Sequence, residues 1–488
     1  MKLKKIFLYS ILTTAPMCVA CEKVLDEPAF SQLEPGNFLT TAEGIESILN
    51  AAFAEGYING GDGKNRTMLE SWATDIQWQT DGAENRIAAQ MIDFTWDSSL
   101  DWLFGSMWLR PYRAIRDANI LLENVDNSNV PENAKALYKA EARFIRALSY
   151  SHLYSWFGPV PLRKSTSDPL ELPRAADQEM QSFIESELLE IIPVLPNPGA
   201  EANYGRPNKG AAMALLCKYY LNTKQWQKSA EMAKNIMDLN YYIVYPDYES
   251  LFKVENERNK EFILVNPQNP RGGGMEYMNG ALPPGFAKEP ISGLTMQGNW
   301  ANWAAQYRLY DSFYNSFDIN DKRKNLIITE YINTQGNIVS LLNNNNTRSF
   351  KYWPDPNAIG NEHGNDMSEI RYADILLSRA EALNELNGPN QESIELINQI
   401  RSRAGLTQPS ALSDFGSKEE LRNYLLDERG WEFYSEVGIR REDQIRMGTF
   451  ISSAIARGHA NAQPFRVLFP IPQAAIDANP QLEQNEGY

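Results

Sequence analysis

The chain has 488 residues, of which 43% are hydrophobic and 11% aromatic, and its formal net charge is −16 at pH 7. This length allows one large core or two closely packed domains. The negative charge argues against nucleic acid or an anionic membrane surface as a partner, because phosphate groups bind to basic patches.

Residues 1–20 have the organisation of a signal peptide. A lysine-rich start precedes an apolar stretch, residues 6–17, that is too short to span a bilayer. The sequence Cys18-Val19-Ala20-Cys21 is similar to a bacterial lipobox, although Cys18 stands where leucine is usual. We therefore expect cleavage before Cys21 and lipidation of this residue; the alternative is ordinary secretory cleavage. Cys217 lies in an apolar run and is expected to be a small buried hydrophobe rather than part of a disulfide.

Helical periodicity recurs along much of the chain. Thr40 and Glu43 have the spacing of a capping box before the first helix. Further pairs are predicted by apolar residues at helical spacing. They cover residues 108–124 with 134–157, residues 209–238, and residues 372–403. The pair at 209–238 loosely follows the tetratricopeptide pattern, and such pairs stack into a solenoid.

Residues 56–102 are predicted to be irregular, because glycines interrupt any periodic pattern. Trp72, Trp78 and Trp96 lie there among aspartate, glutamine and asparagine side chains. Indole rings flanked by amides and carboxylates suit a carbohydrate, whose C–H faces stack on rings while its hydroxyls need hydrogen-bond partners. Taken individually, each of these tryptophans is more often a core residue or a loop anchor than a ligand platform.

Residues 240–366 are the least helical part of the chain, and their aromatic candidates for ligand contact are Tyr277, Trp300, Trp303 and Trp353. The alternative for Trp300 and Trp303 is the start of a helix packed on the scaffold. The glycines at 272–274 are not framed as a nucleotide loop, and the acidic run at 318–321 lacks the glycine of a calcium loop. The histidines, including His152, are not at ligand spacing, so we predict neither a metal nor a cofactor.

Residues 368–448 predict an antiparallel helix pair followed by a third, charge-rich helix over 421–448. The third segment interleaves acidic and basic residues with aromatic ones. Partly buried charges must be paired, so we expect a structural ion-pair network rather than a catalytic carboxylate pair. Its expected members are Glu428, Arg429, Glu432, Glu436, Arg440, Arg441, Asp443 and Arg446.

These segments resemble the SusD/RagB family of outer-membrane nutrient-binding lipoproteins. The resemblance is carried by RYADILLSRAEALNE at 371–385, INQIRSRAGL at 397–406 and ERGWEFYSEVGIRREDQIRMG at 428–448. A second match, EARFIRAL at 141–148 followed by FGPVP at 157–161, lies in an earlier helix pair. The C-terminal segment also matches, except that Glu486 stands where proline is usual.

The resemblance implies a mainly α fold in which tetratricopeptide-like helix pairs form a solenoid scaffold with an irregular, loop-rich ligand-binding region. Residues 21–240 would be the helical N-terminal region and 241–488 the C-terminal region packed on it. It also implies a surface lipoprotein of the outer membrane, palmitoylated at Cys21. In the utilization of starch or another polysaccharide, this protein would capture an oligosaccharide and pass it to a SusC-like TonB-dependent transporter. Trp78 is the first choice for glycan stacking and Trp300–Trp303 the second, with Tyr277, Trp72 and Trp96 as further candidates.

Two alternatives remain open on the sequence. RagB-like members of the family handle peptides, and acidic loop residues serve either cargo. An enzyme, such as a glycosidase, is the other alternative; the chain has no HExxH, GxSxG or P-loop motif, although unpaired catalytic carboxylates leave no such signature.

Overall fold

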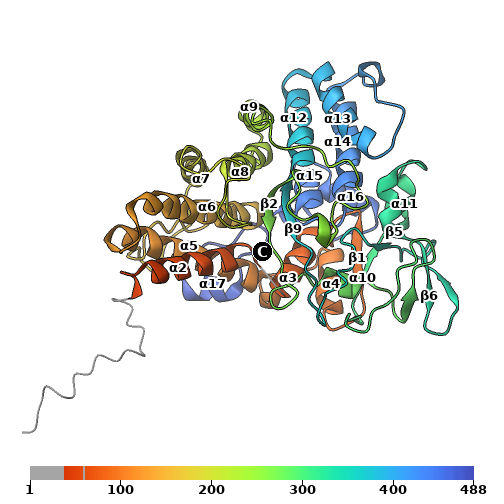
Figure 1. Ribbon diagram of the computed structural model, residues 1–488, viewed down its shortest axis with the longest axis horizontal. Coiled ribbons are helices and arrows are strands. Elements are labelled where there is room, and N and C mark those ends of the chain that lie inside the picture. Colours follow the sequence, from red (N-terminus) through yellow and green to blue (C-terminus); the bar gives the residue numbers. More distant parts are fainter. Residues whose placement is uncertain (1–37, 59–60) are drawn as a thin grey trace, which may run out of the picture.

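The computed structural model of the protein describes residues 38–58 and 61–488, and Figure 1 shows a mainly helical molecule with a few short strands. The predicted signal peptide and Cys21 lie outside the described residues. The longer helices are α2 (Ala42–Gly56), α3 (Gly61–Ser71), α5 (Asp101–Asn124), α6 (Glu132–Phe157), α7 (Asp177–Ile191), α8 (Lys209–Asn222), α9 (Trp226–Met237), α12 (Tyr372–Asn387), α13 (Gln391–Arg403) and α14 (Lys418–Phe433). The shorter ones are α4 (Asn85–Ile92), α10 (Tyr277–Ala281), α11 (Asp311–Ser316), α15 (Ile439–Arg446), α16 (Phe450–Ala456) and α17 (Gln473–Ala478).

The helices pack in a continuous series. α2 packs on α5, α5 on α6, and the contacts continue through α7 and α8 to α9. α9 then packs on α12, which also contacts α13 and α14, so the series extends into the C-terminal third of the chain (Figure 1). The predicted fold class, helix pairs forming a scaffold, is confirmed.

Side-chain caps and small residues explain where these helices begin and how closely they approach. The Gly44 backbone N–H donates to Thr41 Oγ1 at 3.0 Å, so the N-cap of α2 is Thr41 rather than the predicted Thr40. In α12, the fully buried Ala373 and Ala380 share an apolar cluster with Ile397 of α13. Their small side chains leave room for the neighbouring helices.

The strands form four small antiparallel sheets. β1 (Gln77–Thr80) pairs with β4 (Gln306–Leu309), and β2 (Phe262–Asn266) pairs with β9 (Met367–Arg371). The other sheets are β3 (Phe286–Lys288), β6 (Glu330–Asn333) and β7 (Ile338–Ser340), and the pair β5 (Ile327–Ile328) and β8 (Arg348–Ser349). The β1–β4 pair joins two segments that are more than 200 residues apart in the sequence. It brings the tryptophan-rich stretch after α2 beside the irregular region near residue 300.

The charge-rich C-terminal segment forms the predicted buried ion-pair network, except that Arg441 forms no ion pair within the described residues and donates to the Val467 carbonyl at 2.6 Å instead. Glu432 pairs with Arg371 at 3.0 Å, with Arg323 at 3.2 Å and with Arg403. Burial alone would raise the pKa of Glu432, but these arginines, Arg403 most strongly, lower it to about 2. Glu436 continues the network by pairing with Arg371 at 2.7 Å.

A second part of this network ties α12 to α14 and α15. Arg429 pairs with Asp374 and with Asp443, each at 2.8 Å, and Arg446 pairs with Asp443 at 2.7 Å and with Glu381 at 2.6 Å. All five side chains are buried. Paired buried charges fix the relative position of the elements that carry them, because removing one partner leaves the other charge uncompensated.

Two predictions of local structure were wrong. The expected single helix over 421–448 is divided into α14, α15 and a connecting turn in which Ser435 and Gly438 have φ values of 60° and 86°. A right-handed helix cannot continue through this left-handed backbone.

The stretch after α2, expected to be irregular, contains α3, β1 and α4. The strand β1, for example, forms by antiparallel pairing with the distant β4, which local periodicity does not show.

Candidate functional site

Trp78 lies on β1 and is held by contacts from the β4 side of the sheet. It is opposite Arg308 in the strand register, and the Arg308 guanidinium lies 5.1 Å from its ring centroid. Tyr310 stacks on the indole with centroids 6.1 Å apart and an interplanar angle of 17°. The indole Nε1–H donates to the Asn345 carbonyl at 2.9 Å. Trp78 is therefore half-buried, with its N–H and part of its ring already occupied by protein groups.

Trp303 and Trp102 contribute to a second aromatic patch, and Lys64 lies between them. The Lys64 ammonium is 5.1 Å from the ring centroid of Trp303 and 5.8 Å from that of Trp102. Trp102 is 46% exposed at the start of α5, whereas Trp303 is half-buried. The Trp303 Nε1–H donates to Asn361 Oδ1 at 3.0 Å. The structure thus brings residues from α3, α5 and the loop before β4 to one place.

The polar groups of this patch balance in charge. Lys64 pairs with Glu84 at 2.9 Å, and both side chains remain partly exposed. Together with the Asn361 amide, they supply donors and acceptors beside two indoles. We call the set Lys64, Glu84, Trp102, Trp303 and Asn361 the Trp102–Trp303 surface. Its combination of aromatic faces and neutralised polar groups fits a neutral, hydroxyl-rich ligand better than a strongly charged one.

Four of the six aromatic residues predicted for glycan stacking lie in the core, so the structure corrects their assignment as surface platforms. Their exposed fractions are 1% for Trp72, 0% for Trp96, 6% for Tyr277 and 7% for Trp300. Hydrogen bonds fix three of them: the Trp96 Nε1–H to Tyr488 Oη at 2.8 Å, the Tyr277 hydroxyl to Gln77 Oε1 at 3.1 Å, and the Trp300 Nε1–H to the Asp355 carbonyl at 2.8 Å. A buried ring has no free face for a sugar. Trp300 also does not begin a helix, so that alternative is corrected as well.

The sequence prediction missed Trp102 and Lys64. The predicted helix began at residue 108, whereas α5 begins at Asp101, which places Trp102 in its first turn. The sequence does contain a signal for the exposure of Trp102. This residue precedes the buried Leu103 and Phe104 and therefore falls on the polar side of an amphipathic helix. An exposed tryptophan on the polar side of a helix is a stronger indication of ligand contact than a tryptophan in a loop of unknown burial.

A groove along α5 and α17 is the largest hollow among those we describe, with a volume of about 810 Å³. Leu109 and Leu170 line it and are 52% and 87% exposed. Exposed aliphatic side chains of this kind suit contact with another apolar surface and offer little to sugar hydroxyls. Within residues 38–58 and 61–488, no group of metal-ligating side chains is arranged to hold an ion, and no helix is long and apolar enough to cross a membrane.

Stacked helix pairs that present a surface of indoles and polar side chains define a helical-repeat binding protein. Two models of known protein families match the sequence, each over a different part of the chain. Residues 240–463 match the SusD family, and residues 25–221 match a family described as starch-binding and associating with the outer membrane. The chain belongs to the SusD family.

Individual SusD-like relatives match this chain over most or all of its length. A SusD-like protein of Formosa agariphila is 25% identical, and the match covers all of both chains. The starch-binding protein SusD of Bacteroides thetaiotaomicron is 23% identical over 84% of this chain and 82% of that protein. Among solved structures, a laminarin-binding SusD-like protein has a TM-score of 0.78 at 22% identity, with 92% of this chain and 100% of that chain covered. At this identity the structural likeness establishes the fold.

Proposed function

We propose that this protein binds an oligosaccharide on the Trp102–Trp303 surface and releases it unchanged. The observation that carries the proposal is the convergence of two accessible indoles, an ion pair and an amide from five separate segments of the chain. Indole faces stack on the C–H faces of sugars, and the flanking groups exchange hydrogen bonds with hydroxyls. Relatives described as binding starch and laminarin support a glycan as the cargo.

Trp78 is the second contact in this proposal. Its ring is half-buried and partly covered by Arg308 and Tyr310, so it would offer an edge rather than a free face. An oligosaccharide that is several residues long would reach beyond a single platform. We expect Trp78 to contribute less to the binding free energy than Trp102 or Trp303.

The proposal includes the cellular setting. Cys21 would carry the lipid that holds the protein at the surface of the outer membrane, and a SusC-like TonB-dependent transporter would receive the bound oligosaccharide. The family described as associating with the outer membrane supports the location. Co-purification of the transporter with the tagged, full-length protein from outer membranes tests the partnership. Recovery of the protein without any transporter would contradict it.

A glycan array followed by calorimetry tests the binding function directly. We expect binding of neutral oligosaccharides, with no product released after prolonged incubation with the pure protein. A peptide library screened in parallel tests the RagB-like alternative. Binding of peptides without binding of any glycan would replace the proposed cargo, and release of shortened sugars would show an enzyme.

A further inference from the structure

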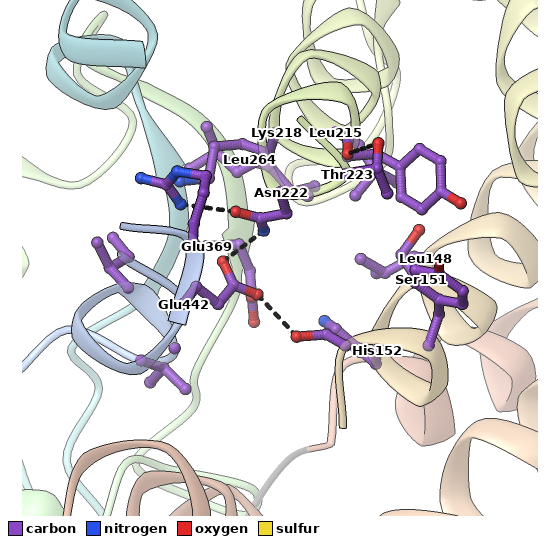
Figure 2. Close-up of a pocket in the computed structure, with 18 of the residues that line it drawn as sticks. Leu148, Ser151, His152, Leu215, Lys218, Asn222, Thr223, Leu264, Glu369 and Glu442 are labelled. Atoms are coloured by element: carbon purple, nitrogen blue, oxygen red, sulfur yellow. Dashed lines mark hydrogen bonds between the residues drawn. The ribbon is translucent and has the colours of Figure 1, made fainter. Parts of the chain in front are cut away.

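A partly open cavity of about 210 Å³ lies where α6, α8, α15 and β9 meet, and Figure 2 shows its lining. It contains none of the residues of the Trp102–Trp303 surface. His152 comes from α6, Asn222 from α8 and Glu442 from α15, so three elements distant in sequence build its polar side. The cavity is therefore a separate feature of the scaffold.

One wall of the cavity is aliphatic. Leu148, Leu215 and Leu264 line it, together with Ile370 and Val437. All five residues belong to the apolar core of the protein. An aliphatic wall of this extent favours a ligand with a hydrocarbon body, because burial of such a body removes apolar surface from water.

Among the charged residues of the lining, one carboxylate has no directly paired cation, and its electrostatic partner is the buried Arg441, which forms no ion pair with it. Arg66 pairs with Glu369 at 2.5 Å, Lys218 with Asp374 at 2.9 Å, and Arg446 with Glu381 at 2.6 Å. Glu442, in contrast, forms no ion pair with any residue that the structure describes. Its carboxylate accepts hydrogen bonds from Asn222 Nδ2 at 2.9 Å and from Ser155 Oγ at 3.1 Å (Figure 2).

Two further polar atoms of the lining have unused hydrogen-bonding capacity. The hydroxyl of the buried Tyr219 and the Nδ1 atom of His152 are inaccessible to solvent and have no partner within the described chain. Burial lowers the pKa of His152 well below its usual 6.5, and the charge of Arg66 lowers it further, so the imidazole is neutral at pH 7. Orphaned polar atoms are costly in a folded protein, and they mark places where a ligand supplies the missing bonds.

We propose that this cavity binds a small organic amine, with its ammonium group against Glu442 and its hydrocarbon body against Leu215, Leu264 and Ile370. A carboxylate without a directly paired cation, two polar atoms with unused hydrogen-bonding capacity and an aliphatic wall together match a protonated amine that has an apolar tail. A neutral alcohol of the same shape would keep the apolar contact and lose the charge pairing. An anion of the same shape would meet Glu442 unfavourably.

Calorimetry at pH 7 with 2-phenylethylamine, 2-phenylethanol and 3-phenylpropanoate tests the proposal. We expect the amine to bind with a stoichiometry of one, the alcohol to bind about 10- to 100-fold more weakly, and the acid not to bind, because only the amine can form a charge-assisted hydrogen bond to Glu442. Failure of the amine to bind, or equal binding of all three probes, would overturn the proposal.

Two variants locate the site. Glu442→Gln keeps the shape but removes the charge; its amide oxygen can still accept from Asn222, and its NH2 group can donate to Ser155 Oγ. It should weaken amine binding at least about tenfold and leave alcohol binding unchanged. Ser151→Trp fills the cavity from its partly exposed rim and should abolish binding of both probes. Unchanged amine binding in Glu442→Gln would contradict the assignment of Glu442 as the ammonium-binding residue. This holds whether or not Ser151→Trp folds. Oligosaccharide binding should persist in both variants, and amine binding should persist in Trp303→Ala, which separates this proposal from the glycan function.

Discussion

The ammonium group of Lys64 lies 5.1 Å from the ring centroid of Trp303. This contact joins α3 to the loop before β4, and the pairing of Lys64 with Glu84 at 2.9 Å holds the ammonium in position. An aromatic face attracts a cation through its quadrupole, so the lysine and the indole stabilise each other's orientation. The platform is therefore preorganised, which reduces the entropy that is lost when a ligand binds.

Replacement of Lys64 tests this role. Lys64→Ala should lower oligosaccharide affinity about 2- to 10-fold, because it removes one hydrogen-bond donor and frees the Trp303 ring to move. Isothermal titration calorimetry with the glycan found by the array measures the change. Lys234→Ala, which removes an exposed lysine from α9, is the matched control and should bind as the natural protein does. Unchanged affinity in Lys64→Ala would remove Lys64 from the site.

Removal of Glu432 should strongly destabilise the fold. Glu432→Ala leaves Arg323, Arg371 and Arg403 buried without their shared carboxylate, and breaking a buried ion pair costs about 3–5 kcal/mol. Urea unfolding followed by tryptophan fluorescence measures the free energy of unfolding. Asp238→Asn removes one partner of the exposed Lys234–Asp238 pair and should cost no more than about 1 kcal/mol. A loss of similar size in the two variants would show that the network adds no stability.

Much of the scaffold follows from local sequence, and the Glu432 network illustrates why. Helical spacing in α12 and α13 is set by contacts between near neighbours in the chain, so periodicity reveals it. The network was predictable because charges interleaved with aromatic residues cannot stay buried unless they pair. The exact partners were not predictable, since Arg323 and Arg371 come from segments far from Glu432 in the sequence.

The binding surface was harder to predict than the scaffold, because exposure depends on distant contacts. Trp96 appears in the sequence as one more loop tryptophan, yet its N–H is bound by Tyr488 at the other end of the chain. The sequence predicts Trp303 as a glycan-stacking residue, but its partners Lys64 and Trp102 come from elements that only the fold brings near it. Residue type alone therefore identified the kind of site and only part of its composition.

The carboxyl group of Glu257 should make stability depend on pH near neutrality. Burial and then the charge of Asp366 raise its pKa from 4.5 to about 8. The folded state therefore favours the protonated form, and the free energy of unfolding should fall as pH rises from about 4.5 through 8. Glu257→Gln imitates the protonated form and should be more stable than the natural protein at pH 9. Urea unfolding at pH 5, 7 and 9 measures the difference, and parallel pH profiles for the two proteins would contradict the assignment.

The thiol of Cys217 should be unreactive in the folded protein. Its side chain is fully buried in α8, as the sequence predicts, and burial raises the pKa of the thiol to about 12. Because the thiolate is the reactive form, a thiol reagent should modify Cys217 only after denaturation. Mass spectrometry after brief labelling with and without urea checks this. Rapid labelling of the native protein would show that α8 opens frequently or packs differently.

Substitution of Cys21 tests the proposed lipid anchor. Cys21→Ser in the full-length protein should block attachment of radioactive palmitate and release the protein from the outer-membrane fraction, since the lipid provides the apolar surface that is buried in the bilayer. Membrane fractionation of the producing bacterium measures both effects. Cys217→Ser should retain both the label and the location. Palmitate incorporation that persists in Cys21→Ser would place the lipid elsewhere.

The most direct test of the account is oligosaccharide binding by Trp102→Ala, Trp303→Ala and the double variant. Calorimetry should show a loss of about tenfold in affinity for each single variant and a greater loss for the double variant, because each change removes a stacking face. Trp226→Ala, which removes a half-buried indole from α9, should keep the natural affinity if it folds with native helicity. Natural affinity in the double variant would contradict the central claim that these two indoles hold the ligand.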